Sequence, residues 1–345
     1  MNFASDNVTG AAPEILEAMA AANDGPLMPY GNDDLTHQVE DKIRQIFETE
    51  ADVFLVATGS AANSLSLSVL TPPWGAVICH RQSHINEDEC GAPEFFTNGA
   101  KLVVLDGPGA KIDAADLDRH AGEGRGDVHR VQPAAASITQ ETEAGTVYSL
   151  DEITAIAEAC HGHEMKLHMD GARFANAVVA LHCSPAEATW KAGVDVLSFG
   201  ATKNGALAAE AVVLFDKGLA EEFAFRRKRG GHLFSKMRLL SAQWDAYLND
   251  DLWLKNARHA NAMAARLGEG LAGVPGVTLP NPVAANELFP ALPRPVIDGL
   301  KADGFGFYEF PGDTIRLVCA YNTKAEDVDA FIAAAQAHAN STAAE

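Results

Sequence analysis

The chain has 345 residues, of which 47% are hydrophobic and 21% are charged, as is common for a globular protein. Its length allows about two domains and a large apolar core. The formal net charge of −21, from 26 basic and 47 acidic residues, argues against a nucleic-acid partner. No run approaches the ~18 apolar residues that a membrane helix needs, and the first residues lack the pattern of a signal peptide.

The five cysteines are an odd number and contain no C-x-x-C pair, which indicates reduced thiols in a cytoplasmic protein. The run Cys160-His161-Gly162-His163, with His168 nearby, resembles a metal-binding cluster. No second cluster with zinc-ligand spacing follows it, so a polar turn is favoured and no metal is expected.

In chain order, helices are expected over 14–22 and 38–47, followed by apolar, strand-like segments that alternate with helices. The strand-like segments are 53–57, 76–79, 101–105, 134–139, 166–170, 194–199 and 211–215. This alternation predicts an α/β fold with a mostly parallel sheet covered by helices on both faces.

The last third of the chain has a different pattern. A long helical region, 243–271, precedes a Pro- and Gly-rich zone, two strands (305–310 and 314–320) and a closing helix (325–338). We expect an N-terminal segment (1–25), a large domain (26–242) and a small α+β domain (243–345).

Lys203 follows the buried-type strand 194–199, at the carboxyl end where open α/β sheets bind their ligands. The small residues Gly200, Ala201 and Gly205 are expected to leave room there for a flat, bulky group. A desolvated lysine amine at this place is a candidate for Schiff-base chemistry. An ordinary solvated loop lysine is the alternative.

Asp170 ends the preceding strand, with room for one helix before the Lys203 strand. Both side chains can therefore emerge at one edge of the sheet. A carboxylate that keeps a pyridine nitrogen protonated, opposite a lysine that holds an aldehyde, is what pyridoxal phosphate requires. Taken alone, Asp170 could also be a turn residue or a helix cap.

Two further segments could contact a phosphate. The turn Thr58-Gly59-Ser60-Ala61-Ala62-Asn63 leads from a strand into a helix, where free backbone N–H groups attract anions. A basic patch at 226–238 contains Lys228, Arg229 and Arg238, and is either a solvated helix face or a source of a cation.

Several separate motifs carry a resemblance to a known family. They are Phe3-Ala4-Ser5-Asp6-Asn7-Val8-Thr9, Tyr30-Gly31-Asn32-Asp33, Ala57 to Asn63, Ser83-His84-Ile85, Met169-Asp170-Gly171-Ala172-Arg173, Ser198 to Gly205 and Ile315-Arg316-Leu317-Val318. With these, nearly the whole chain resembles the low-specificity L-threonine aldolases, pyridoxal-phosphate enzymes of the aspartate-aminotransferase fold (fold type I). The segment 230–235 departs from the family's usual glycine run.

The resemblance implies a role for each matching residue. Lys203 would hold the cofactor, and Asp170 would pair with its pyridine nitrogen. His84 would stack on the ring near the substrate's β-hydroxyl and, directly or through water, remove the hydroxyl proton. Gly59, Ser60 and Ala61 would hold the phosphate, and Arg173 would lie near the cofactor's phenolic oxygen and the substrate carboxylate. Ser5 and Arg316 would grip that carboxylate. Tyr30 and one of Lys228, Arg229 and Arg238 would reach a neighbouring subunit's site in a homo-oligomer, expected as a dimer of dimers.

The implied reaction cleaves L-threonine, L-allo-threonine and related β-hydroxy-α-amino acids, such as phenylserine, to glycine and an aldehyde. An aminotransferase or a β-eliminating lyase on the same fold would need the same lysine and acid, and a cofactor-free binding protein is a third reading.

One position departs from the family. Glu143 stands where many members carry a histidine close to the β-hydroxyl. Glu143 either faces the pocket, where it would bind or remove the hydroxyl proton, or is a loop acid that points to water.

Overall fold

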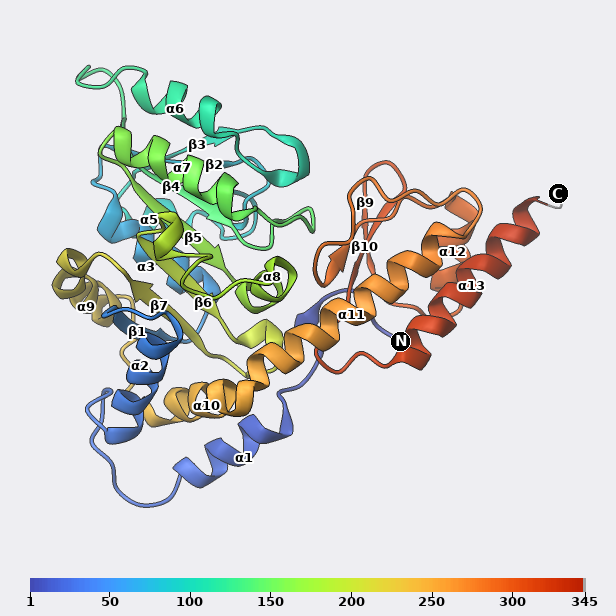
Figure 1. Cartoon of the computed structure of the whole chain (residues 1–345), viewed down its shortest axis with the longest axis horizontal. Coiled ribbons are helices and arrows are strands. Elements are labelled where there is room, and N and C mark those ends of the chain that lie inside the picture. The colour runs from blue at the N-terminus through green and yellow to red at the C-terminus, as the bar shows by residue number, and fades with distance from the viewer. Residues whose placement is uncertain (344–345) are drawn as a thin grey trace.

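The computed structural model describes residues 1–343, and its elements follow the expected alternation of strands and helices (Figure 1). The helices are α1 (Pro13–Ala22), α2 (Asp34–Ile46), α3 (Gly59–Leu70), α4 (His84–Glu87), α5 (Ala92–Phe96), α6 (Ala114–Gly122), α7 (Leu150–Gly162), α8 (Phe174–Leu181), α9 (Ala220–Arg229), α10 (Arg238–Leu248), α11 (Leu252–Ala272), α12 (Arg294–Ala302) and α13 (Ala325–Ala343). The strands are β1 (Asp52–Val56), β2 (Gly75–His80), β3 (Lys101–Leu105), β4 (Gln132–Thr139), β5 (Lys166–Gly171), β6 (Val196–Gly200), β7 (Glu210–Leu214), β8 (Glu287–Leu288), β9 (Tyr308–Phe310) and β10 (Thr314–Val318).

The seven expected strand segments form one sheet in the order β1-β7-β6-β5-β4-β2-β3. All its neighbouring pairs are parallel except those of β7, which runs antiparallel to both β1 and β6. The prediction of a mostly parallel sheet is therefore confirmed.

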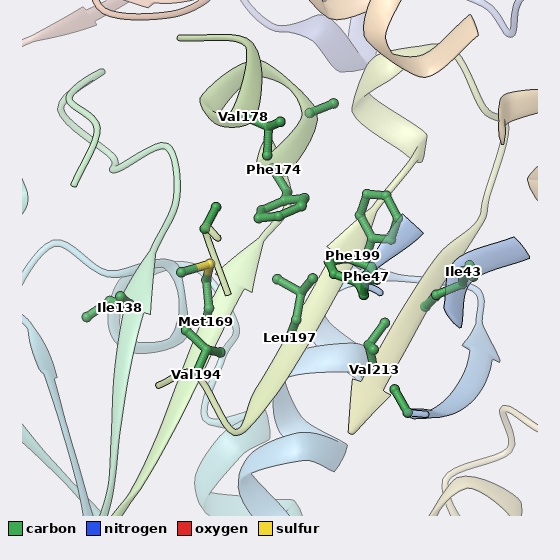
Figure 2. Close-up of a cluster of buried hydrophobic side chains, with 14 of the residues drawn as sticks. Ile43, Phe47, Ile138, Met169, Phe174, Val178, Val194, Leu197, Phe199 and Val213 are labelled. Atoms are coloured by element: carbon green, nitrogen blue, oxygen red, sulfur yellow. The ribbon is translucent and has the colours of Figure 1, made fainter. Parts of the chain in front are cut away.

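Alternate residues of the central strands enter two different cores, one on each face of the sheet. In β6, Val196 packs with α3 and α9 on one face, whereas Leu197 and Phe199 pack on the other. Figure 2 shows the second core, where side chains of neighbouring strands lie together with Phe47 and with Phe174 of α8. A strand buried on both faces reads as a continuous apolar run, which is why these segments were recognisable in the sequence.

A second, three-stranded antiparallel sheet, β8-β10-β9, has its own core against α11, α12 and α13. Figure 1 shows α11 running from the large sheet to this small one. Its first turns contribute Trp253 and Ala257 to the large core, and later turns contribute Ala264 and Leu267 to the small one. The division into domains of 26–242 and 243–345 stays a prediction, and Phe3 of the N-terminal segment packs in the small core.

The long helical region expected over 243–271 is divided between two helices, α10 and α11. Asp250 and Asp251 both have positive φ, at 50° and 55°, and they separate α10 from α11. Aspartate tolerates this left-handed conformation better than most residues, so the acidic pair acts as a break. The strands expected over 305–310 and 314–320 are shorter, and β8 was not foreseen.

The histidines of the 160–168 region have ordinary partners. His161 pairs with Asp195 at 2.9 Å and His163 with Asp118 at 2.9 Å. His168 is fully buried between the hydroxyls of Ser137 and Ser198, each 2.9 Å away, and burial lowers its pKa to about 4. Within residues 1–343, no helix is long and apolar enough to cross a membrane.

Candidate active site

The candidate residues lie along one edge of the large sheet. The strands β1, β6, β5, β4 and β2 end at this edge, and β7 begins there because it runs in the opposite direction. In the order of the sheet, the residues at or just beyond these strand ends are Thr58, Glu210, Lys203, Asp170, Thr139 and His84.

These strand ends line a cavity of about 360 Å³. Seven of the expected site residues are on its walls: Gly59, Ser60, His84, Glu143, Asp170, Arg173 and Lys203. Because β5 and β6 are adjacent and parallel, with Asp170 opposite Ser198, the carboxylate and the lysine emerge side by side. The predicted juxtaposition of Asp170 and Lys203 is thus present in the structure.

Asp170 is held by two donors and is connected to His84. Asn63 donates from Nδ2 to Asp170 Oδ2 at 2.7 Å, and Ala172 N–H donates to Oδ1 at 3.0 Å. Asn63 Nδ2 also donates to Glu89 Oε1 at 2.9 Å. Glu89 Oε1 in turn lies 2.8 Å from His84 Nδ1. The hydrogen bond to Glu89 raises the pKa of His84, which favours the charged imidazolium.

Glu143 faces the cavity, so the alternative of a loop acid pointing to water is wrong. Its Oε1 accepts hydrogen bonds from His84 N–H and from Thr139 Oγ1, both at 2.8 Å. Its Oε2 is buried without a hydrogen-bond partner among the described residues. Burial raises the pKa of Glu143 to about 7, so the carboxyl titrates near neutral pH.

Arg173 reaches the cavity from a buried cluster of acids. Its Nε and Nη2 donate to the two oxygens of Asp6 at 2.8 and 3.1 Å, and it also forms an ion pair with Glu287. Burial acts to lower the pKa of Arg173, but these carboxylates outweigh it and raise that pKa. Glu141 lies beside Glu287, and burial followed by the Glu287 charge raises the pKa of Glu141.

The start of α3 forms the far wall of the cavity. Thr58 caps the helix by accepting from Ala61 N–H at 3.2 Å, while Gly59 and Ser60 face the cavity. The Ala61 N–H, expected to hold a phosphate, is therefore already engaged and Ala61 is not on the cavity wall. The space beside Gly59 is open, because a Cβ atom at this position would meet nothing within 4 Å.

Besides Ala61, four expected site residues are not on the wall of this cavity. Ser5 accepts from Asn7 N–H at 3.1 Å, and Arg316 donates to Ala4 O at 3.0 Å. Tyr30 lines a neighbouring groove of about 720 Å³ that shares Ala208 with the cavity. Arg229 is exposed at the end of α9.

The small residues around Lys203 do not open room for a ligand, which corrects that expectation. A Cβ at Gly200 would lie 2.6 Å from the backbone oxygen of Ala172, so glycine permits the close approach of two strands. Gly205 has φ of 109°, and Ala201 is fully buried in the core. None of the three is on the cavity wall.

Sequence reasoning missed several residues of the site: Asp6, Asn63, Glu89, Glu141, Glu210 and Glu287. Two of them carried a readable signal. Asn63 lies one helical turn after Gly59, on the same face of α3, and Glu210 is an acid directly attached to the apolar run of β7. The others depend on tertiary contacts between distant segments.

The comparisons with known proteins agree with this geometry. Residues 2–292 match the model of a protein family described as beta-eliminating lyase. The chain belongs to the beta-eliminating lyase family. It is 48% identical over 327 residues, 94% of each chain, to the low specificity L-threonine aldolase of Pseudomonas aeruginosa.

Solved structures support the same assignment. A threonine aldolase from Leishmania major has a TM-score of 0.91 and 30% identity, covering 97% of this chain and 98% of that one. An aspartate aminotransferase from Rhodobacter sphaeroides, with a TM-score of 0.72 and 16% identity over 99% of this chain and 92% of that one, shares the fold alone. The expected fold type I is therefore confirmed.

Enzymes of the beta-eliminating lyase family depend on pyridoxal phosphate, and the cavity offers the donors that this cofactor needs. Asp170 would face the pyridine nitrogen, and Lys203 would offer an amine to the aldehyde. The first turn of the twelve-residue helix α3 would offer N–H groups and the Ser60 hydroxyl to a phosphate. The residues present thus fit the group.

Proposed function

We propose that this lyase cleaves L-threonine, L-allo-threonine and related β-hydroxy-α-amino acids, such as phenylserine, to glycine and an aldehyde. The observation that carries the proposal is the row of Lys203, Asp170 and Glu143 on one cavity wall, in a chain 48% identical to a low specificity L-threonine aldolase. When bound, pyridoxal phosphate supplies an electron sink for the electron pair released at Cα.

The proposed role of Lys203 is to hold the cofactor's aldehyde, and that of Asp170 is to keep the pyridine nitrogen protonated. The Asp170 carboxylate is held in place for this role by two donors, Asn63 Nδ2 and Ala172 N–H. His84 is proposed to stack on the ring, with its orientation fixed by Glu89.

Glu143 is proposed to remove the β-hydroxyl proton. A general base works best when its pKa is near the working pH, and burial brings that of Glu143 to about 7. The buried Oε2 without a partner gives it a free acceptor, whereas the hydrogen bond with Glu89 favours a protonated His84, which is a poorer base.

Arg173, Ser5 and Arg316 are proposed to bind the substrate carboxylate. Asp6 and Glu287 fix the Arg173 guanidinium at the cavity wall, which lowers the entropy cost of binding there. Arg316 Nε is buried and has no hydrogen-bond partner among the described residues, and an orphaned donor of this kind is suited to an anion.

The active enzyme is proposed to be a homo-oligomer, at least a dimer and expected as a dimer of dimers, in the cytoplasm. Support comes from exposed apolar side chains, between 43% and 64% exposed: Tyr30, which lines the groove beside the cavity, Leu27 and Met28, which precede it in the chain, and Leu207 on the cavity wall. The Lys228 ammonium lies 4.9 Å from the centre of the Tyr30 ring, so the aromatic ring and a basic-patch cation are presented together. Of Lys228, Arg229 and Arg238, Arg238 already donates to Gly25 O at 2.7 Å.

The purified enzyme should be mixed with L-threonine, and acetaldehyde and glycine should be assayed against keto-acid formation. Equimolar acetaldehyde and glycine are expected, whereas keto acid would indicate an aminotransferase or a β-eliminating reaction on the same fold. A panel of threonine, allo-threonine and phenylserine, scored by glycine release, would then rank the side chains that the enzyme accepts.

A further inference from the structure

Glu210 is an acid in the catalytic cavity to which the proposed function gives no role. It opens β7, is only 6% exposed, and lies on the cavity wall. Its backbone is opposite Val56 of β1 on one side and Gly200 of β6 on the other. Glu210 therefore lies between the Thr58–Ser60 turn at the start of α3 and the Thr202–Asn204 turn that carries Lys203.

This position matters because of how the cofactor must span the sheet edge. With Asp170 on β5, Lys203 on β6 and the α3 start after β1, the strand that separates the lysine from the phosphate end is β7. Its first residue is Glu210. A cofactor held by Lys203 and by the first turn of α3 would therefore have this carboxyl between its two attachment points.

The surroundings of Glu210 do not favour a negative charge. Among the described residues no basic side chain forms an ion pair with Glu210, and Thr202 of the Lys203 turn lies beside it on the cavity wall. The charged groups that act on it are Lys203, which favours its charge, and Asp170, which does not. Burial dominates and raises the pKa of Glu210 to about 7.

A phosphate brought to the start of α3 would add a further negative charge close to Glu210. Two like charges in a buried site cannot both be kept without a large electrostatic cost. A protonated carboxyl, in contrast, offers an O–H donor that a phosphate oxygen can accept.

We propose that Glu210 holds a proton in the loaded enzyme and donates a hydrogen bond to the phosphate of pyridoxal phosphate. The inference rests on the proposed function, because it requires that cofactor. The alternative is a purely structural role, in which Glu210 only holds the Lys203 turn through Thr202.

The test is cofactor binding, measured without turnover. The full chain, freed of cofactor, is titrated by calorimetry with pyridoxine 5′-phosphate between pH 7 and 9. This probe keeps the phosphate but has no aldehyde for Lys203, and its phosphate is already doubly charged because its second pKa is about 6. Pyridoxine, which lacks the phosphate, corrects for titration of the ring.

Above pH 7 the Kd of the parent for pyridoxine 5′-phosphate, divided by its Kd for pyridoxine, should rise by up to about tenfold per pH unit. The reason is that binding of the phosphate requires a proton that Glu210 has lost in the free enzyme. Glu210→Gln keeps the shape and an N–H donor, so its Kd should stay constant over this range. Glu158→Gln is the control: Glu158 is an exposed glutamate on α7, outside the cavity, so this variant should keep the parent's slope.

A parent with a constant Kd, or a Glu210→Gln variant with the parent's slope, would overturn the inference. If Glu210→Gln does not fold, the number of protons that the parent takes up on binding pyridoxine 5′-phosphate decides between the two roles. This number is measured by calorimetry at pH 8 in two buffers of different ionisation enthalpy. Uptake approaching one proton is expected, and no uptake overturns the proposal. No binding of the probe at any pH would reject the cofactor site itself, and with it the proposed function.

Discussion

Replacing Glu143 with glutamine removes the proposed base and leaves its shape and contacts in place. In the parent, Oε1 accepts from His84 N–H and Thr139 Oγ1, and a glutamine carbonyl oxygen can accept the same two hydrogen bonds. The amide nitrogen then takes the place of Oε2, which has no partner among the described residues. The substitution therefore isolates the proton-accepting function of this side chain.

The expected loss follows from that function. A positioned general base contributes about 10²- to 10⁴-fold, so Glu143→Gln should lower kcat/KM for threonine by at least about tenfold, or about 1.4 kcal/mol of transition-state stabilisation. Glu143→Ala should lose at least as much, because it also leaves two donors unpaired. Glu143→His should change the preference between threo and erythro substrates, since a histidine can donate to the β-hydroxyl as well as accept from it.

The pH dependence gives a separate check. The carboxyl must be ionised to act as a base, so the parent's kcat/KM should fall by about tenfold per pH unit below pH 7, and this limb should be absent in Glu143→Gln. Stability should change in the opposite sense. The pKa of Glu143 is about 7 in the folded protein and about 4.3 in the unfolded chain. The parent therefore loses free energy of unfolding as the pH rises from about 4.3 to about 7. The glutamine variant should therefore melt no lower than the parent at pH 8.

The assay is aldehyde release from threonine, allo-threonine and phenylserine between pH 5.5 and 9, with melting curves for each protein. Glu158→Gln, a change of an exposed glutamate on α7, is the matched control and should behave as the parent. If the Gln, Ala and His variants at position 143 all match the parent on the three substrates, Glu143 is not the base.

Four further outcomes are expected. Lys203→Ala should abolish both the yellow colour of the bound cofactor and turnover, because Lys203 is the one lysine on the cavity wall among the described residues; retention of both would refute the central assignment. Asp170→Asn should weaken cofactor retention and slow cleavage with the fold intact, since a neutral partner no longer favours a protonated pyridine; unchanged kcat and cofactor affinity would count against it. Glu141→Gln should become more stable than the parent as pH rises from 5 to 8, by up to about 1.4 kcal/mol of unfolding free energy per pH unit. The reason is that the Glu141 carboxyl is ionised in the unfolded chain but kept neutral by burial and Glu287 in the folded one. A difference in melting temperature between the two proteins that does not change with pH would contradict this. Light scattering at assay concentration should show at least a dimer, and an active monomer would exclude a shared site at Tyr30.

The central strands β2, β6 and β7 were predictable because they are buried on both faces and read as short apolar runs. For β6, burial of every residue from Val196 to Gly200 is what made the segment visible without knowledge of its neighbours. The pairing of Asp170 with Lys203 followed from the same pattern, since parallel strands joined by a helix end at one edge of a sheet.

What the sequence did not reveal depends on energetic exceptions. The strand prediction began at Ala211 and left out Glu210, because a carboxylate is rarely placed in a buried strand. The break at Asp250 and Asp251 was hidden by helical patterns on both sides. The buried partners of Arg173 come from the N-terminal segment and from β8, and no local pattern links segments so distant in the chain.

The cavity wall carries four acids, Glu141, Glu143, Asp170 and Glu210, and the positions of the last three favour a division of tasks. Asp170 is held by two donors, whereas Glu143 and Glu210 have no ion-pair partner among the described residues, and burial raises the pKa of each to about 7. Glu143 follows β4 and Glu210 opens β7, so the β5 and β6 ends with Asp170 and Lys203 lie between them. A proton can thus be accepted at the substrate end and kept at the phosphate end, because burial holds both carboxyls close to the point where either state is accessible. Two glutamates with similar pKa values can serve opposite purposes here, since one must lose its proton to act and the other must retain it.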